Sequence, residues 1–261
     1  MSLQVIHSTA DIKNLLRPFL KSEKKIGFVP TMGALHLGHA TLIEKARLDN
    51  VITIVSIFVN PTQFNDPSDF IKYPKTFQSD CELLQKLNVD YLFFPSKDEI
   101  YSDEYRYKLN EYRDSLILCG GKRPGHFEGV LTVVMKLLNI IKPTNAYFGL
   151  KDFQQYQLIN EMVATFFLDI NIIGVETVRE KSGLAMSSRN TRLSENGKLL
   201  AAKIFPLISS DLNLEEILKI LESQNIQVEY LTEKWERIFI AFFIEGVRLI
   251  DNCSKTKFEK K

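Results

Sequence analysis

The stretch Val51–Val59 constrains the fold of this chain more than any other part of the sequence. It reads VITIVSIFV, which is rich in β-branched residues and almost continuously apolar. A strand of this kind is expected where both faces of a sheet are covered, as in a parallel sheet flanked by helices. We therefore expect a buried parallel sheet at the centre of the fold.

Short apolar runs alternate with segments of helical spacing over much of the chain. Further strands are expected at residues 26–30, 91–94, 146–148 and 171–178, and helices at 39–49, 79–87, 129–141 and 153–166. The alternation predicts an α/β fold with right-handed crossovers, that is, a Rossmann-like parallel sheet with helices on both faces.

The character of the sequence changes after Leu193, where a smaller α+β unit is expected. Ser194 is a plausible N-cap of a helix that runs towards Ile208. A second helix at 214–221 and a pair of strands at 237–243 and 246–250 follow. We predict a Rossmann-like domain over residues 1–177 and a small, shortened C-terminal domain over residues 178–261.

Composition excludes several classes of protein. The net charge of +1 gives no electrostatic footprint for a nucleic acid. No apolar run reaches the roughly 18 residues of a membrane span, and residues 1–6 lack the pattern of a signal peptide. The cysteines Cys81, Cys119 and Cys253 are widely spaced, as is typical of reduced thiols in a cytoplasmic protein.

Four unusual segments directly follow four of the expected strands. They are Thr31–Gly33, Asn60–Phe64, Gly149–Asp152 and Arg179–Arg189. Ligands bind at the carboxyl ends of the strands in an open parallel sheet. The four segments are therefore expected to converge on one edge of the sheet.

Two histidines, His36 and His39, lie where a glycine-containing turn enters a helix. Helix N-termini attract phosphate, and imidazole N–H groups can donate to its oxygens as charge develops. The histidines could instead cap the helix or bind a metal ion. The metalloprotease pattern requires a glutamate between two histidines, and that glutamate is absent. We interpret the pair as a phosphate site.

Two other segments carry positive charge near the expected sheet edge. Lys151 and Asp152 alone are typical of a solvated first helical turn, but beside a nucleotide Lys151 can neutralise phosphate. Met186–Arg189 combines two hydroxyls with a guanidinium, which can hold a triphosphate and its leaving pyrophosphate. The same four residues also occur in ordinary surface loops.

The remaining candidates stay ambiguous at this stage. Gln63 and Gln155 can hydrogen-bond a small hydroxylated substrate, or they can simply be exposed. The glycine-rich loop Gly120–Phe127, which contains Arg123, either covers an anion or is a turn that leads into the next helix.

Several stretches together resemble the pantothenate synthetase (pantoate–β-alanine ligase) family of the nucleotidyltransferase superfamily, related to class I aminoacyl-tRNA synthetases. The matching stretches are Pro30–His39, Ile57–Phe64, Tyr73–Thr76, Arg123–Phe127, Tyr147–Gln155, Gly183–Asn190 and Arg248–Asn252. The resemblance implies that pantoate attacks the α-phosphate of Mg-ATP and that β-alanine then displaces AMP from pantoyl adenylate. It also implies a homodimer.

The resemblance assigns roles to individual residues. Residues expected to contact ATP are Met32, Gly33, Ala34, Leu35, His36, Leu37, Gly38, His39, Gly149, Leu150, Lys151, Asp152, Val178, Met186, Ser187, Ser188 and Arg189. His39 is expected as the active-site acid, and His36, Lys151 and Arg189 as further catalytic groups. Residues expected to bind pantoate or β-alanine are Gln63, Gln155, Asn60 and Arg123. Asp80 matches a position near Mg²⁺.

The chain departs from the family pattern at three places. Leu150 stands where the family usually has glutamate, and Ser182 where it usually has aspartate. The C-terminal domain also looks short between residues 210 and 234. Two rival functions remain, namely an adenylyltransferase or tRNA-synthetase-like enzyme with another acceptor, and a nucleotide-binding protein without activity.

Overall fold

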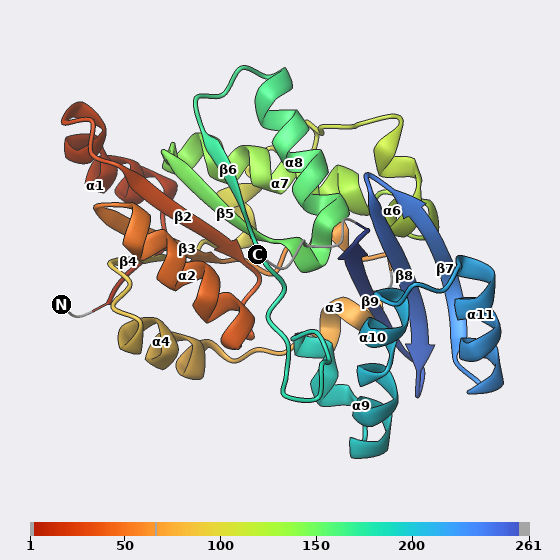
Figure 1. Ribbon diagram of the computed structural model, residues 1–261. Coiled ribbons are helices and arrows are strands. Elements are labelled where there is room, and N and C mark those ends of the chain that lie inside the picture. Colours follow the sequence, from red (N-terminus) through yellow and green to blue (C-terminus); the bar gives the residue numbers. More distant parts are fainter. Residues whose placement is uncertain (1–2, 66, 256–261) are drawn as a thin grey trace, which may run out of the picture. The chain divides into compact units, whose positions relative to one another are not determined.

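The computed structural model describes residues 3–65 and 67–255, which form two compact units (Figure 1). The first unit extends to Leu150 and resumes over Gln154–Val175. The second contains Lys151–Phe153 and the chain from Glu176 onward. The division predicted from the sequence falls between residues 177 and 178 and assigns Lys151–Phe153 to the first domain.

Within the described residues, the first unit contains a six-stranded sheet in the order β1-β4-β3-β2-β5-β6, with every pair parallel. The strands are β1 (Gln4–Ile6), β2 (Ile26–Thr31), β3 (Ile52–Ile57), β4 (Tyr91–Phe93), β5 (Asn145–Gly149) and β6 (Asn171–Val175). All residues of β3 are buried, which confirms the prediction made from its apolar run. Strand β1 was not predicted, because its three residues are too few to show a periodic pattern.

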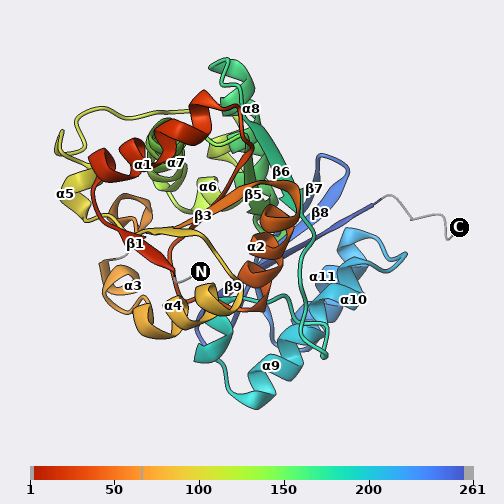
Figure 2. The ribbon, with the colours of Figure 1, turned by 90° about the vertical axis from the view of Figure 1, so that its left-hand side faces the viewer.

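Helices cover both faces of this sheet, as predicted (Figure 2). Those of the first unit are α1 (Thr9–Lys21), α2 (Leu37–Asp49), α3 (Pro67–Ile71), α4 (Phe77–Lys86), α5 (Lys97–Ile100), α6 (Leu118–Lys122), α7 (His126–Ile141) and α8, which begins at Phe153 and ends at Thr165. Ile43 of α2 and Leu84 of α4 pack with Val55 on one face. Helices α1 and α7 contact one another on the other face.

The strand order places β2 between β3 and β5. The connection from β2 leads to β3 on one side, whereas β5 is added on the other side. This reversal is the topological switch point of the sheet, where open α/β folds bind their ligands. The segments that follow β2 and β5, beginning at Met32 and Leu150, therefore leave the sheet at its expected binding edge.

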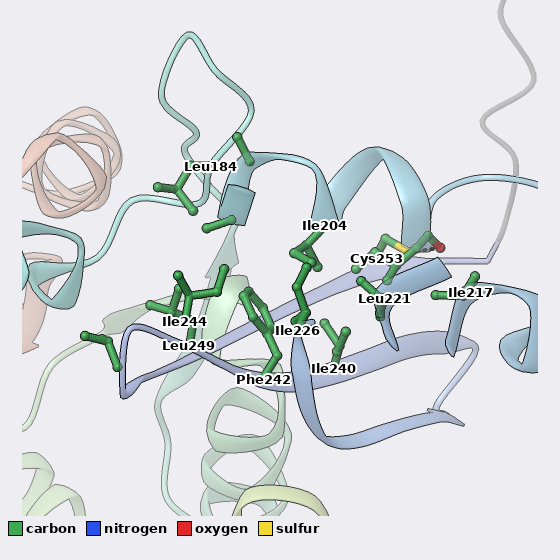
Figure 3. Packing of buried hydrophobic residues seen from close by; sticks show 14 of the residues in the cluster. Leu184, Ile204, Ile217, Leu221, Ile226, Ile240, Phe242, Ile244, Leu249 and Cys253 are labelled. Carbon is green, nitrogen blue, oxygen red and sulfur yellow. Dashed lines mark hydrogen bonds between the residues drawn. The ribbon is translucent and has the colours of Figure 1, made fainter. Parts of the chain in front are cut away.

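The second unit is an antiparallel sheet covered by helices. Its elements are α9 (Glu195–Ala202), α10 (Ile204–Ile208), α11 (Leu214–Ser223), β7 (Gln227–Lys234), β8 (Arg237–Ile244) and β9 (Val247–Ser254). Figure 3 shows its core, in which Ile240 and Phe242 lie among the helix residues Ile204 and Leu221.

The sequence prediction for this unit was right in type but wrong in detail. Ser194 caps α9 by accepting from the Gly197 amide, as predicted. The single helix predicted to run to Ile208 is interrupted at Lys203, because Pro206 cannot donate to the carbonyl of Ala202. Strand β7 was missed, since its side chains are polar or only half-buried.

Candidate active site

The turn after β2 is held by a buried carboxylate. Asp80 of α4 accepts hydrogen bonds from the backbone amides of Ala34 (3.0 Å) and Leu35 (2.8 Å) and from the hydroxyl of Thr76 (3.0 Å). Gly33 and Ala34 both have positive φ angles, 79° and 51°, which direct these two amides towards the carboxylate. The turn is thus fixed by Asp80, a contact between distant parts of the chain.

The two histidines cap α2 reciprocally. Nδ1 of His36 accepts from the Gly38 amide, and Nδ1 of His39 accepts from the His36 amide, each at 3.2 Å. A ring nitrogen that accepts carries no proton, so in both neutral rings the proton is on Nε2. The ring centroids are 4.1 Å apart. The cap therefore sets both the tautomer and the orientation of two neighbouring imidazoles.

The turn after β3 centres on Asn60, which is 1% exposed. Its amide donates to Oε1 of Gln63 (3.0 Å) and to the carbonyl of Gly129 (3.1 Å). Its Oδ1 accepts from the hydroxyls of Tyr101 (2.7 Å) and Thr62 (3.0 Å). Asn60 thereby fixes the side chain of Gln63, whose own amide lies 3.1 Å from the sulfur of Met32.

Arg123 and His126 hold the backbone of the same turn. Arg123 Nη2 donates to the Gln63 carbonyl (3.2 Å), and His126 Nδ1 lies 2.8 Å from the same oxygen. The guanidinium also lies 3.1 Å from His126 Nε2. The structure therefore gives Arg123 a contact with Gln63, while its contact with a substrate anion stays a prediction.

Helix α8 carries two adjacent glutamines with different environments. Gln154 is buried and holds α6 in place, since it donates to the carbonyls of Asp114 and Ile117 and accepts from the Cys119 amide. Gln155 is only half-buried. Gln155 is a residue predicted from the sequence, whereas Gln154 and Tyr101 were not predicted, because nothing in the local pattern distinguishes them.

Several of the predicted ATP residues lie in the second unit, namely Lys151, Asp152, Val178 and Met186–Arg189. Val178 and Met186 are joined, since the Met186 amide donates to the Val178 carbonyl at 2.9 Å. Ser187 accepts from the Arg189 amide and so begins the short 3₁₀ helix η4 (Ser188–Arg192). The buried Asn190 donates to Glu180 and to the Ala185 carbonyl, both at 3.0 Å. Met186–Arg189 is therefore a structured loop.

The two single-residue departures from the family pattern, Leu150 and Ser182, lie in different surroundings. A Cβ on Gly174 would lie 2.6 Å from the side chain of Leu150, so Leu150 packs directly onto β6. The Ser182 hydroxyl lies 3.4 Å from the amide of Leu184 within an exposed turn.

The residues do not form a ready metal site. Among residues 3–65 and 67–255, no group of three histidines, cysteines or acidic residues is placed to hold a metal ion. Asp80 is 3% exposed, and both its oxygens already accept hydrogen bonds. The structure thus gives Asp80 a use in the fold, and its proximity to Mg²⁺ stays a prediction.

Replacing Asp80 with asparagine tests this use. The variant would place an amide N–H₂ against backbone donors, so we expect the free energy of unfolding to fall by about 1–3 kcal/mol. Urea denaturation without ligand measures this directly. An unchanged unfolding curve, combined with a higher Mg²⁺ requirement in the assay, would assign Asp80 to the metal and not to the turn.

Replacing Tyr101 with phenylalanine tests the Asn60 network. Burial raises the pKa of Tyr101 to about 12, so its hydroxyl remains a donor to Asn60 at pH values where a free tyrosine ionises. Loss of this donor should lower kcat/KM for the substrate that Gln63 is predicted to bind by an amount equivalent to about 1–2 kcal/mol. The ratio of kcat/KM in the unmodified chain to kcat/KM in Tyr101→Phe, measured by steady-state kinetics, should stay constant between pH 7 and pH 9. A loss that shrinks as the pH rises would contradict the raised pKa, because ionisation of Tyr101 would remove the same donor from the unmodified chain.

No helix among the described residues is long and apolar enough to cross a membrane.

A family model described as pantoate-beta-alanine ligase matches residues 4–211. The pantothenate synthetase of Bdellovibrio bacteriovorus is 49% identical over 249 residues, which cover 95% of this chain and 98% of that protein. The chain belongs to the pantoate-beta-alanine ligase family.

Solved structures of pantoate-beta-alanine ligases show the same fold. The Francisella tularensis ligase, complexed with beta-gamma ATP and beta-alanine, matches with a TM-score of 0.91 and 45% identity over 97% of this chain and 98% of that one. The Thermus thermophilus pantothenate synthetase matches with a TM-score of 0.89 and 33% identity, covering all of that chain. These ligases are matched over nearly their whole length, so the second domain carries no large deletion relative to them.

Membership of the pantoate-beta-alanine ligase family confirms the predicted enzyme class and activity. The chain is an ATP-dependent ligase that condenses pantoate with β-alanine. This activity replaces the two rival functions, an enzyme with another acceptor and a nucleotide-binding protein without activity. The roles of individual residues remain predictions.

Proposed function

We propose that this chain makes pantothenate in two steps through pantoyl adenylate. A pantoate carboxylate oxygen attacks the α-phosphorus of ATP, and pyrophosphate leaves. The amine of β-alanine then attacks the acyl carbon, loses a proton, and expels AMP. The observation that best supports this chemistry is the reciprocal cap of His36 and His39 at the end of β2. ATP and β-alanine as substrates are further supported by the Francisella complex.

The first step requires stabilisation of charge on the transferring phosphate. The Nε2–H groups of His36 and His39 are suited to donate to phosphate oxygens, with His39 as the active-site acid. In the second unit, Lys151 and Arg189 supply positive charge, and Ser187 and Ser188 supply hydroxyls. The proposed ATP contacts also include Met32–Leu35, Leu37, Gly38, Gly149, Leu150, Asp152, Val178 and Met186.

Pantoate is proposed to bind Gln63 and Gln155. Side-chain amides can both donate and accept, which suits a substrate with hydroxyls and a carboxylate. Asn60 supports this role by fixing the orientation of Gln63. The mechanism needs no covalent intermediate with the enzyme, so positioning and charge stabilisation provide the catalysis.

The proposal also includes a metal ion, an oligomeric state and a location in the cell. Mg²⁺ is expected to arrive with ATP as a substrate complex and to neutralise phosphate charge. A homodimer and a cytoplasmic location are expected from the family resemblance. No disulfide joins Cys81, Cys119 and Cys253, which is compatible with a reducing compartment.

One assay tests the proposal. ATP–pyrophosphate exchange should depend on pantoate and should not need β-alanine, because the first step alone is reversible. Exchange supported by an amino acid in place of pantoate would indicate another acceptor. If neither compound supports exchange although ATP binds, the chain would be a nucleotide-binding protein without the proposed activity.

A further inference from the structure

The segment Arg248–Asn252, which belongs to β9, has no role in the chemistry described so far. Its side chains alternate across the sheet of the second unit. Leu249 lies in the hydrophobic core, and Asp251 forms a two-pronged ion pair with Arg179, with N–O distances of 2.7 and 2.9 Å. Asn252 is paired with Phe239 of β8, and it is 3% exposed. A buried amide needs fixed partners, and those partners indicate its use.

Asn252 connects Lys151 to Arg237. Its Nδ2 donates to the backbone carbonyl of Lys151 (2.9 Å), and its Oδ1 accepts from Nε of Arg237 (2.7 Å). A carbonyl can only accept and an arginine N–H can only donate, so the amide fits in one orientation. Asn252 therefore fixes the backbone of Lys151 with a defined polarity.

The residues after Lys151 are held on the same sheet. The ring of Phe153 lies 6.1 Å from that of Trp235 and 6.0 Å from that of Phe239. The guanidinium of Arg237 lies 4.6 Å from the centre of the Phe153 ring. Arg237 thus contacts both Asn252 and Phe153, and together they place the segment Lys151–Phe153 in the second unit.

The side chain of Lys151 is held much less firmly than its backbone. Its ammonium lies 3.8 Å from the carboxylate of Asp152, which is beyond hydrogen-bonding distance. The side chain is 18% exposed, so solvent does not surround it. The position of the ammonium consequently depends on the position of the Lys151 backbone, from which the side chain extends.

We propose that Asn252 is a positioning residue for Lys151 in the adenylation step. The inference depends on the proposed role of Lys151 at the phosphates of ATP. By fixing the Lys151 carbonyl, Asn252 limits the region that the ammonium can reach. The reaction of pantoyl adenylate with β-alanine does not use this charge, so it does not need Asn252.

The variant Asn252→Asp removes the donor to Lys151 while retaining an oxygen for Arg237. We expect pantoate-dependent ATP–pyrophosphate exchange to slow by about tenfold or more, with KM for pantoate changed less than about twofold. Supplied pantoyl adenylate should react with β-alanine at the normal rate. The matched control is Asn139→Asp, since Asn139 is exposed and also donates to a backbone carbonyl, that of Met135. If Asn252→Asp does not fold, Arg237→Lys tests the hydrogen bond between Arg237 and Asn252 instead.

A double-mutant cycle with Lys151→Met separates positioning from general damage. In that background Asn252→Asp should slow exchange by less than about twofold, because the ammonium that it positions is gone. A full penalty in the Lys151→Met background, or equal loss in both half-reactions, would overturn the proposal.

The dissociation constant for ATP, measured by calorimetry in the same four proteins, gives a readout that does not need turnover. Asn252→Asp should weaken ATP binding about threefold or more only when Lys151 is present. Equal weakening in both backgrounds would refute the role of Asn252, whatever the exchange assay shows. Absence of exchange in the unmodified chain, with this dependence on Lys151 intact, would instead refute the proposed function.

Discussion

Replacing Lys151 with methionine is expected to slow pantoate-dependent ATP–pyrophosphate exchange by at least about 100-fold, equivalent to a few kcal/mol. Methionine keeps much of the length of the lysine stem but removes the positive charge. If Lys151 neutralises charge as pyrophosphate leaves, the loss should fall on kcat for exchange. The second half-reaction, measured with supplied pantoyl adenylate, should stay within about twofold of normal.

The control for this prediction is Lys219→Met. Lys219 is exposed, and its ammonium lies 2.7 Å from the carboxylate of Glu215. Lys219→Met therefore removes the same charge from the same unit. Surface pairs of this kind contribute little to stability, and we expect normal exchange. Normal exchange in Lys151→Met itself would remove Lys151 from the mechanism, and with it the basis for the role of Asn252.

A pair of substitutions at His39 is expected to separate its two functions. Asparagine can place an oxygen near the position of Nδ1 and keep the cap on the His36 amide, but it lacks a donor at the Nε2 position. Glutamine can place a donor near Nε2, but it does not reproduce the cap. If His39 acts as the acid, His39→Asn should lower exchange by about 100-fold or more while it preserves stability.

The two variants should therefore give opposite patterns. His39→Gln should retain more exchange than His39→Asn but should lower the free energy of unfolding by about 1 kcal/mol through loss of the cap. Denaturant unfolding and the exchange assay measure the two effects separately. Equal exchange in both variants, or a defect of the same size with supplied pantoyl adenylate, would show that His39 does not act in the first step.

The sheet of the first unit was predictable because its signal is local. The apolar run around Val55 and the helical spacing of the segments between strands are properties of consecutive residues. The second unit was predicted less well for the same reason. Its break at Lys203 results from one proline, and the edge strand β7 buries too little surface to need an apolar pattern.

The residues of the candidate site also differ in whether they could be predicted from local sequence. The histidines, Lys151 and the loop Met186–Arg189 stand out in the sequence because unusual residues occur together. The residues that hold them in place do not stand out in the sequence. Asp80 contacts residues 45 and 46 positions away, and Asn252 contacts a residue 101 positions away. A buried polar residue reveals its function only through its partners.

The sequence by itself determined the family, the activity and the parallel sheet, because the chemistry requires particular residues close together after particular strands. Only the tertiary structure decided how these residues are oriented. It showed that backbone amides of the α2 cap set the tautomers of His36 and His39, that Asp80 holds the turn before them, and that Lys151 belongs to the second unit. The physical reason is that hydrogen bonds orient a side chain across any separation in sequence, and a sequence pattern records only neighbours.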